Sequence, residues 1–118
     1  ALEQSLRVTL KLSVLKKGSA EIPSKSGSLK SPFAETEKYW IAVGLDQDLD
    51  EAMKMAIRES IRFLHEVKEM SKQTALAYLS AATDFEVSQV VDKVKGVHSL
   101  IRKSDFSADE EKEEIANQ

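Results

Sequence analysis

Apolar and polar residues alternate in several stretches of this chain, and a period of two predicts β-strands. In residues 6–14 every second residue is Leu or Val, with Arg, Thr, Lys or Ser between them. Residues 39–45 are apolar on both faces, which predicts an interior strand in which Gly44 allows a bulge or a close backbone approach. Residues 85–92 alternate again, and a turn and a short strand over residues 97–101 follow them.

Between the second and third of these strands, apolar residues recur every three or four positions, which predicts two helices. Asp48 followed three residues later by Glu51 is an N-terminal capping pattern, so we expect a long helix to begin there. Ser71 is a second candidate cap, for a shorter helix with Ala75 and Leu79 on its apolar stripe. Each stripe predicts a helix face that packs on the sheet.

The predicted element order is β-β-α-α-β-β, which indicates an α+β fold. One small, mostly antiparallel sheet with a helix pair packed on one face satisfies this order. A chain of 118 residues is long enough for one hydrophobic core, so we expect a single domain over residues 1–106. Residues 107–118 form an acidic tail with five carboxylates and one lysine, and the Ser-, Lys- and Gly-rich residues 16–32 predict an exposed loop.

The composition mainly excludes certain kinds of site and partner. Positive and negative residues are interspersed and the formal net charge is −3, so no basic face for a nucleic acid is indicated. Cysteine is absent, which excludes a disulfide, a thiol nucleophile and a thiolate metal site. No apolar run approaches the roughly 20 residues that cross a bilayer, and no secretory segment is recognisable. We therefore expect a cytoplasmic protein with neither a nucleic-acid nor a membrane partner.

Ser88 and Gln89 are the polar interruption of the third strand, and they are the first candidates for chemistry. A buried Gln must find hydrogen-bond partners, so its amide is either bonded across the sheet or directed at a substrate amide. A nucleophilic serine needs an adjacent base, and neither histidine of the chain is near Ser88 in sequence. A structural hydroxyl is the simpler interpretation, and a base from another segment remains an open alternative.

Asp84 and Asp92 bracket the same strand at an even spacing, so an unbent strand places both side chains on one face. That spacing is too long for both carboxylates to bind one ion directly. Asp92 is better explained as the end of the strand at a turn, whereas Asp84 could either serve a site or cap the turn after the second helix. No second histidine stands three or four residues from His65 or His98, so we interpret both as structural or surface residues.

Three segments carry a resemblance to a known family: Leu49-Asp-Glu-Ala-Met53, Ala75-Leu-Ala-Tyr-Leu-Ser80 and Asp84-Phe-Glu-Val-Ser-Gln-Val-Val-Asp92. Together they resemble the C-terminal part of the acetamidase/formamidase family of linear-amide hydrolases. The resemblance covers residues 8–101, and Ser88-Gln89-Val90-Val91-Asp92 is its most specific part. Three positions depart from the family pattern: Thr83 replaces a Gly, Glu86 replaces an Arg and Lys93 replaces a Pro.

The resemblance implies hydrolysis of formamide or acetamide to the carboxylate and ammonia. In such a family the metal-binding and catalytic groups belong mainly to an N-terminal part, so we expect this segment alone to be inactive. A divalent metal would be bound through that part, and the present chain offers no evident metal ligands or assigned catalytic residue. Asp84, Ser88 and Gln89 would line or buttress the substrate side. The expected partners are the N-terminal part or another subunit, in a homo-oligomer.

Two hypotheses follow from these observations. In the first, the chain is a cut piece of an amide hydrolase, namely its C-terminal α+β portion. In the second, the chain is a non-catalytic binding or oligomerisation module that keeps the fold. The absence of a histidine cluster and the altered positions around the signature motivate the second hypothesis.

Overall fold

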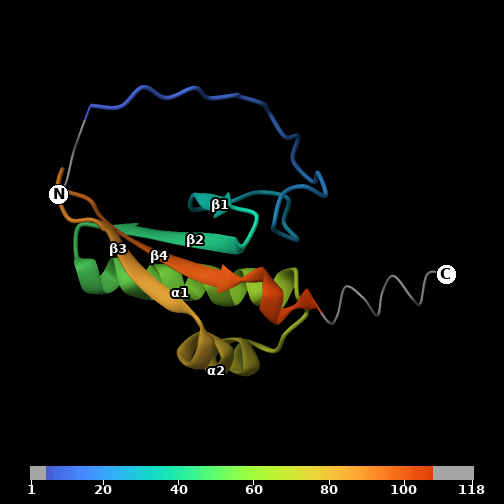
Figure 1. Ribbon diagram of the computed structural model, residues 1–118. Coiled ribbons are helices and arrows are strands. Elements are labelled where there is room, and N and C mark those ends of the chain that lie inside the picture. The colour runs from blue at the N-terminus through green and yellow to red at the C-terminus, as the bar shows by residue number, and fades with distance from the viewer. Residues whose placement is uncertain (1–4, 108–118) are drawn as a thin grey trace.

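The computed structural model describes residues 5–107, and Figure 1 shows their arrangement. The elements are β1 (Phe33–Glu35), β2 (Tyr39–Asp46), α1 (Leu49–Glu66), α2 (Lys72–Ala82), β3 (Asp84–Gln89), β4 (Lys95–Arg102) and a short 3-10 turn (Lys103–Asp105). This is the predicted β-β-α-α-β-β order. The predicted acidic tail lies outside the described residues, apart from its first residue. None of the helices described is long and apolar enough to cross a membrane.

The four strands form one antiparallel sheet in the order β1-β2-β4-β3, which confirms the α+β fold. Strand β2 lies between β1 and β4, as its two apolar faces predict. Strand β4, which carries His98, is also interior, between β2 and β3. The buried residues Val97, Ser99 and Ile101 of β4 face the helices, and His98 and Leu100 therefore point to the opposite, open face of the sheet.

Both helices begin where the capping residues predict. The Asp48 carboxylate accepts a hydrogen bond from the Glu51 backbone N–H at 3.0 Å, and the Ser71 hydroxyl accepts one from the Thr74 N–H at 3.1 Å. These bonds satisfy N–H groups that the first turn of a helix leaves unpaired. Figure 1 shows α1 running along the sheet and α2 lying next to α1, below it in this view.

The core lies between α1 and the sheet, and its largest buried side chain is Phe63, which is 1% exposed. Its ring packs against Phe33 and Trp40 at centroid distances of 5.1 and 5.3 Å. A buried hydroxyl pair joins the two layers as well: Ser60 on α1 bonds Ser99 on β4 at 2.9 Å. Both hydroxyls are satisfied, because Ser60 also donates to a carbonyl of its own helix and Ser99 accepts a backbone N–H of β2.

The prediction of a strand over residues 6–14 is wrong for this chain. These residues form no regular element, and their apolar side chains are 64–93% exposed. The first strand of the sheet is instead β1, for which the sequence pattern predicted no element. A period of two describes which side chains share a face, but a strand also needs a neighbour for its backbone N–H and C=O groups. Within residues 5–107, the segment has no such neighbour.

Residues 16–32 form the predicted loop, and part of it is anchored to α1. The Lys25 backbone N–H donates to the Glu66 carboxylate at 3.0 Å, and the Arg62 guanidinium donates to the Pro23 carbonyl at 3.2 Å. The loop also closes on itself between Gly18 and Gly27. This segment is therefore tied to the last turns of α1.

The C-terminal part of the described chain is held against α2 by Tyr78. Its hydroxyl donates to the Asp105 carboxylate at 2.7 Å, and its ring lies 5.3 Å from that of Phe106. Burial, and secondarily the hydrogen bond to Asp105, raises the pKa of Tyr78 to about 12.

We expect Tyr78 to make the free energy of unfolding fall at alkaline pH. The folded state favours the neutral phenol, so the stabilisation is complete below the ordinary pKa of 10.0 and is lost as pH rises towards about 12. Absorbance titration of the tyrosinate should show an ionisation near the upper value that Tyr78→Phe removes. If the variant titrates like the parent chain, the assignment to Tyr78 is wrong.

Candidate active site

The β3–β4 hairpin contains an irregularity at Ser88. Val87 pairs with Val97 and Gln89 pairs with Gly96, so Ser88 is an extra residue in a β-bulge. A bulge changes the direction of the side chains that follow it, and bulges are frequent beside functional sites. Here the bulge brings Ser88 and Gln89 to the same open face. Both side chains lie against the side of Gly96 where a Cβ atom would stand. The alternation in the sequence had placed them on opposite faces.

Gly96 provides the room for this arrangement. A Cβ atom at this position would lie 3.2 Å from Leu45 Cδ2 and 3.3 Å from Ser88 Cβ, which is tighter than ordinary contact. The absent side chain lets Ser88 lie directly over β4. The position of the serine is therefore fixed by the bulge on one strand and the glycine on the next.

Ser88 forms a hydrogen bond to a histidine across the hairpin. Its Oγ lies 2.6 Å from Nδ1 of His98, and Nε2 of the same ring lies 3.6 Å from the Glu86 carboxylate. Glu86 and His98 are directly opposed in the strand register. The His98 and Glu86 side chains are 24% and 57% exposed, so the three groups form a line on the open face that solvent can reach.

The neighbours of His98 favour one arrangement of its protons. A carboxylate can only accept, so Glu86 favours the proton on Nε2, and the unprotonated Nδ1 then accepts the Ser88 hydroxyl hydrogen. This is the arrangement in which a histidine can take a proton from a serine. A nucleophile bonded to a base, with a third group beside the base, is the pattern that nucleophilic catalysis requires.

The other two candidates from the sequence occupy different positions. Gln89 donates from its amide to the Val94 carbonyl at 2.8 Å, so this side chain braces the hairpin turn. Asp84 is exposed at the far end of β3, where it pairs with Leu100 rather than with the residues around Ser88. Of the three, only Ser88 contacts a potential base.

Asp92 lies in the turn between β3 and β4, as predicted, but it does not end the strand, because β3 ends at Gln89. Asp92 and Lys93 both have positive φ, at 62° and 70°. Both residues lie in the connection between β3 and β4, over residues 90–94, where the backbone reverses direction. A proline cannot adopt such a φ, so the lysine at position 93 is compatible with a turn that a proline would exclude.

Sequence reasoning did not find His98 and Glu86 as site residues. The signal available was that Glu86 and Ser88 share a strand face, and that β4 follows β3 as its antiparallel neighbour. The pairing of residue 98 with residue 86 could not be read from the sequence, because the bulge shifts the register after Val87.

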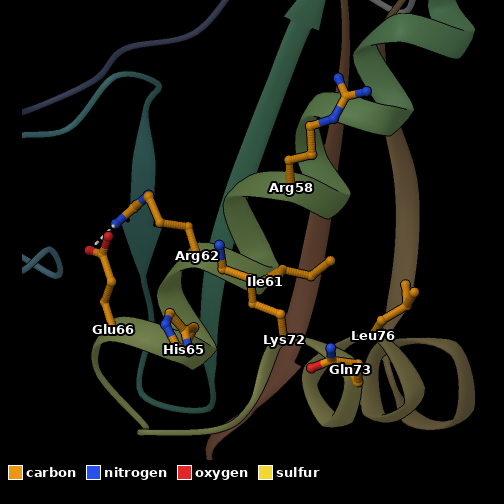
Figure 2. Close-up of a pocket in the computed structure, with 8 residues that line it drawn as sticks. All are labelled: Arg58, Ile61, Arg62, His65, Glu66, Lys72, Gln73 and Leu76. Atoms are coloured by element: carbon orange, nitrogen blue, oxygen red, sulfur yellow. Dashed lines mark hydrogen bonds and ion pairs between the residues drawn. The ribbon is translucent and has the colours of Figure 1, made fainter.

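The hollow between α1 and α2 is a second place where polar groups gather (Figure 2). It has a volume of about 510 Å³ and is lined by Arg58, Ile61, Arg62, His65, Glu66, Lys72, Gln73 and Leu76. Arg62 reaches Glu66 at 3.1 Å and Glu59 at 2.9 Å, so two carboxylates neutralise its charge. His65 is bonded through Nδ1 to the Met70 carbonyl at 2.7 Å. These contacts give Arg62, Glu66 and His65 structural roles at the end of α1.

Metal ligands are not gathered in the part of the chain that the structure describes. No group of three or more His, Asp or Glu side chains there could hold an ion. Ser88 and Gln89 also do not line the hollow between the helices. The candidate site is thus one serine–histidine–carboxylate line on an uncovered sheet face.

The fold and this site define an α+β domain with a serine–histidine pair on the open face of its sheet. No protein-family model matches the chain, and no curated protein matches it in sequence. The crystal structure of an acetamidase from Bacillus halodurans does match, with a TM-score of 0.61 and 26% sequence identity. The match covers 65% of this chain and 26% of the acetamidase, so the matched region corresponds to about a quarter of that enzyme's length. The fold is acetamidase-like, and the chain resembles part of an amide hydrolase.

Proposed function

We propose that this chain is the C-terminal part of a hydrolase that cleaves the C–N bond of short linear amides, with formamide and acetamide as substrates. The observation that carries this proposal is the likeness to the acetamidase in both fold and sequence. The Ser88–His98 hydrogen bond supports it, because amide hydrolysis needs a group that can move a proton beside the reacting carbon. Ammonia and the carboxylate are the products.

The chain by itself leaves this site open to solvent. We propose that the remaining part of the enzyme, or another subunit of a homo-oligomer, covers the open face and encloses Ser88. Excluding water strengthens electrostatic stabilisation of the tetrahedral intermediate, which an exposed strand cannot provide. The isolated chain should therefore have little or no amidase activity.

Two further parts of the proposal come from the family resemblance. A divalent metal bound by residues outside this chain would polarise the amide carbonyl. Asp84 and Gln89 would act as supporting residues, Gln89 by holding the hairpin turn and Asp84 at the start of β3. The cytoplasmic location stays a prediction.

Ammonia release provides the test. A longer polypeptide that joins this chain to its upstream sequence, purified with divalent metal supplied, should release ammonia from formamide or acetamide. Residues 1–118 alone should not do so under the same conditions. If the longer polypeptide releases no ammonia from either amide, the enzymatic proposal is wrong.

The exposed N-terminal segment favours a second candidate function, assembly. Residues 6–14 alternate exposed apolar side chains with polar or basic ones, and β3 is an edge strand that alternates Phe85 and Val87 with the acidic Asp84 and Glu86. The segment of one copy could add to β3 of another with apolar and opposite-charge neighbours on matching faces. Such addition would pair backbone groups that an edge strand leaves free.

Light scattering distinguishes this candidate from a monomeric chain. If strand addition operates, the chain should form a dimer that Leu10→Lys disrupts. The matched change Thr9→Lys falls on the polar face and should leave the dimer intact. A chain that is monomeric at every concentration tested would exclude assembly by this route.

A further inference from the structure

We infer that Ser88 is a nucleophile, with His98 as its general base and Glu86 as a positioning residue. The inference rests on the proposed amide-hydrolase function and assigns the group that attacks the substrate. Its basis is the line of contacts across the hairpin, with Ser88 Oγ 2.6 Å from Nδ1 of His98 and the Glu86 carboxylate 3.6 Å from Nε2.

The contacts of the four other serines on α1, α2 and β4, or at the start of α2, differ from those of Ser88. The hydroxyls of Ser60 and Ser99 are buried and bonded to each other, Ser71 caps α2, and the Ser80 hydroxyl donates to a carbonyl of its own helix. These hydroxyls have structural partners. Ser88 is exposed, and the partner of its hydroxyl is an imidazole, which can accept the proton and return it.

The local backbone holds Ser88 in this position. The bulge makes Ser88 the extra residue of β3, and Gly96 leaves the space next to its Cβ free. Gln89 fixes the following turn through Val94. A nucleophile on paired strands is held more tightly than one on a free loop, so the serine and its base keep their relative positions during the reaction.

The reaction then has two steps. Ser88 Oγ attacks the amide carbon, its proton moves to Nδ1 of His98, and the carbonyl electron pair moves onto oxygen. Collapse of this intermediate breaks the C–N bond, His98 gives its proton to the leaving nitrogen, and ammonia departs from an acyl-serine. Water then attacks the acyl carbon while His98 takes its proton, the ester C–Oγ bond breaks, and His98 returns the proton to Ser88 Oγ, which releases the carboxylic acid.

Glu86 does not touch the substrate in this scheme. Its carboxylate lies 3.6 Å from Nε2 of His98, and its negative charge favours the tautomer with the proton on Nε2. This assignment differs from a purely structural role, because removing the charge should change the reactivity of Ser88 without changing the fold.

Covalent labelling tests the inference on the 118-residue chain itself. A fluorophosphonate probe reacts with activated serines, so mass spectrometry of the labelled chain should place the adduct on Ser88. Ser88→Ala should abolish the adduct, and His98→Gln should slow labelling about 100-fold, the size expected for loss of a general base. Glu86→Gln should slow it by a smaller factor. Circular dichroism should be the same for all variants, since these side chains are exposed or half-buried.

The second histidine provides the matched control. His65 bonds a backbone carbonyl on the opposite side of the molecule from the open face, so His65→Gln should leave labelling unchanged. An adduct on another serine, or equal labelling in the parent chain and His98→Gln, would overturn the inference. No adduct on the parent chain would overturn it as well.

The outcome separates this inference from the proposed function. If Ser88 is labelled but the longer polypeptide releases no ammonia, the nucleophile stands and the amide substrate is wrong. If the longer polypeptide releases ammonia and its Ser88→Ala variant does so equally fast, the amidase function stands and the nucleophile is wrong.

Discussion

Replacing Gly44 by alanine is expected to destabilise this chain strongly. A Cβ atom at Gly44 would lie 2.1 Å from the Ala52 carbonyl oxygen and 2.4 Å from the Ala56 nitrogen, both in the backbone of α1. Backbone of a packed helix cannot move aside as a side-chain tip can, so α1 must shift away from β2. We expect a loss of about 3 kcal/mol or more in the free energy of unfolding, at or beyond the upper end for overpacking.

Urea denaturation followed by circular dichroism measures this loss. Gly96→Ala is the matched control, because its new Cβ would meet only the side chains of Leu45, Ser88 and Gln89, at 3.2–3.6 Å. These side chains can adjust, so the control should retain most of the stability. Equal losses for the two variants would show that the contact between β2 and α1 is not the cause.

Phe63→Ala is expected to have an effect of similar size for the opposite reason. The ring is 1% exposed and packs against Phe33 and Trp40, so removing it leaves a cavity between α1 and the sheet. Deletion of a buried Phe typically lowers the free energy of unfolding by about 3–5 kcal/mol. A small domain is stable by only about 5–15 kcal/mol, so this loss removes a large share of the total.

The neighbouring Phe33 provides the comparison for this variant. It belongs to the short edge strand β1 and is only partly buried. Phe33→Ala should therefore reduce stability clearly less than Phe63→Ala in the same urea experiment. A loss below about 1 kcal/mol for Phe63→Ala would mean that the site collapses around the missing ring or that Phe63 is not central to the core.

The residues behind these predictions lie on the two sides of one sheet. Its helix-facing side is closed by the contacts of Gly44 and Phe63, whereas its open side carries Ser88 and His98. A rigid scaffold on one side with exposed polar groups on the other is the arrangement on which the proposed function rests. The likeness to the acetamidase covers 26% of that enzyme.

The sequence by itself determined the elements whose cause is local. The side chains of Asp48 and Ser71 cap the helix starts, and the two apolar faces of residues 39–45 indicate an interior strand. Gly44 was expected to permit a close approach, and the helix backbone lies against it. Each of these depends on neighbours within a few residues or on the burial of a whole face, and both can be read from spacing.

The tertiary structure decided every feature that depends on strand pairing. Residues 6–14 have the alternation of a strand, yet within the described chain no neighbouring strand pairs with them, and β1 takes the first place in the sheet. The base for Ser88 comes from His98, ten residues away, because a hairpin with a bulge sets the register between β3 and β4. Strand pairing is a contact between distant residues, and one extra residue changes every partner beyond it, so only the folded chain brings this site together.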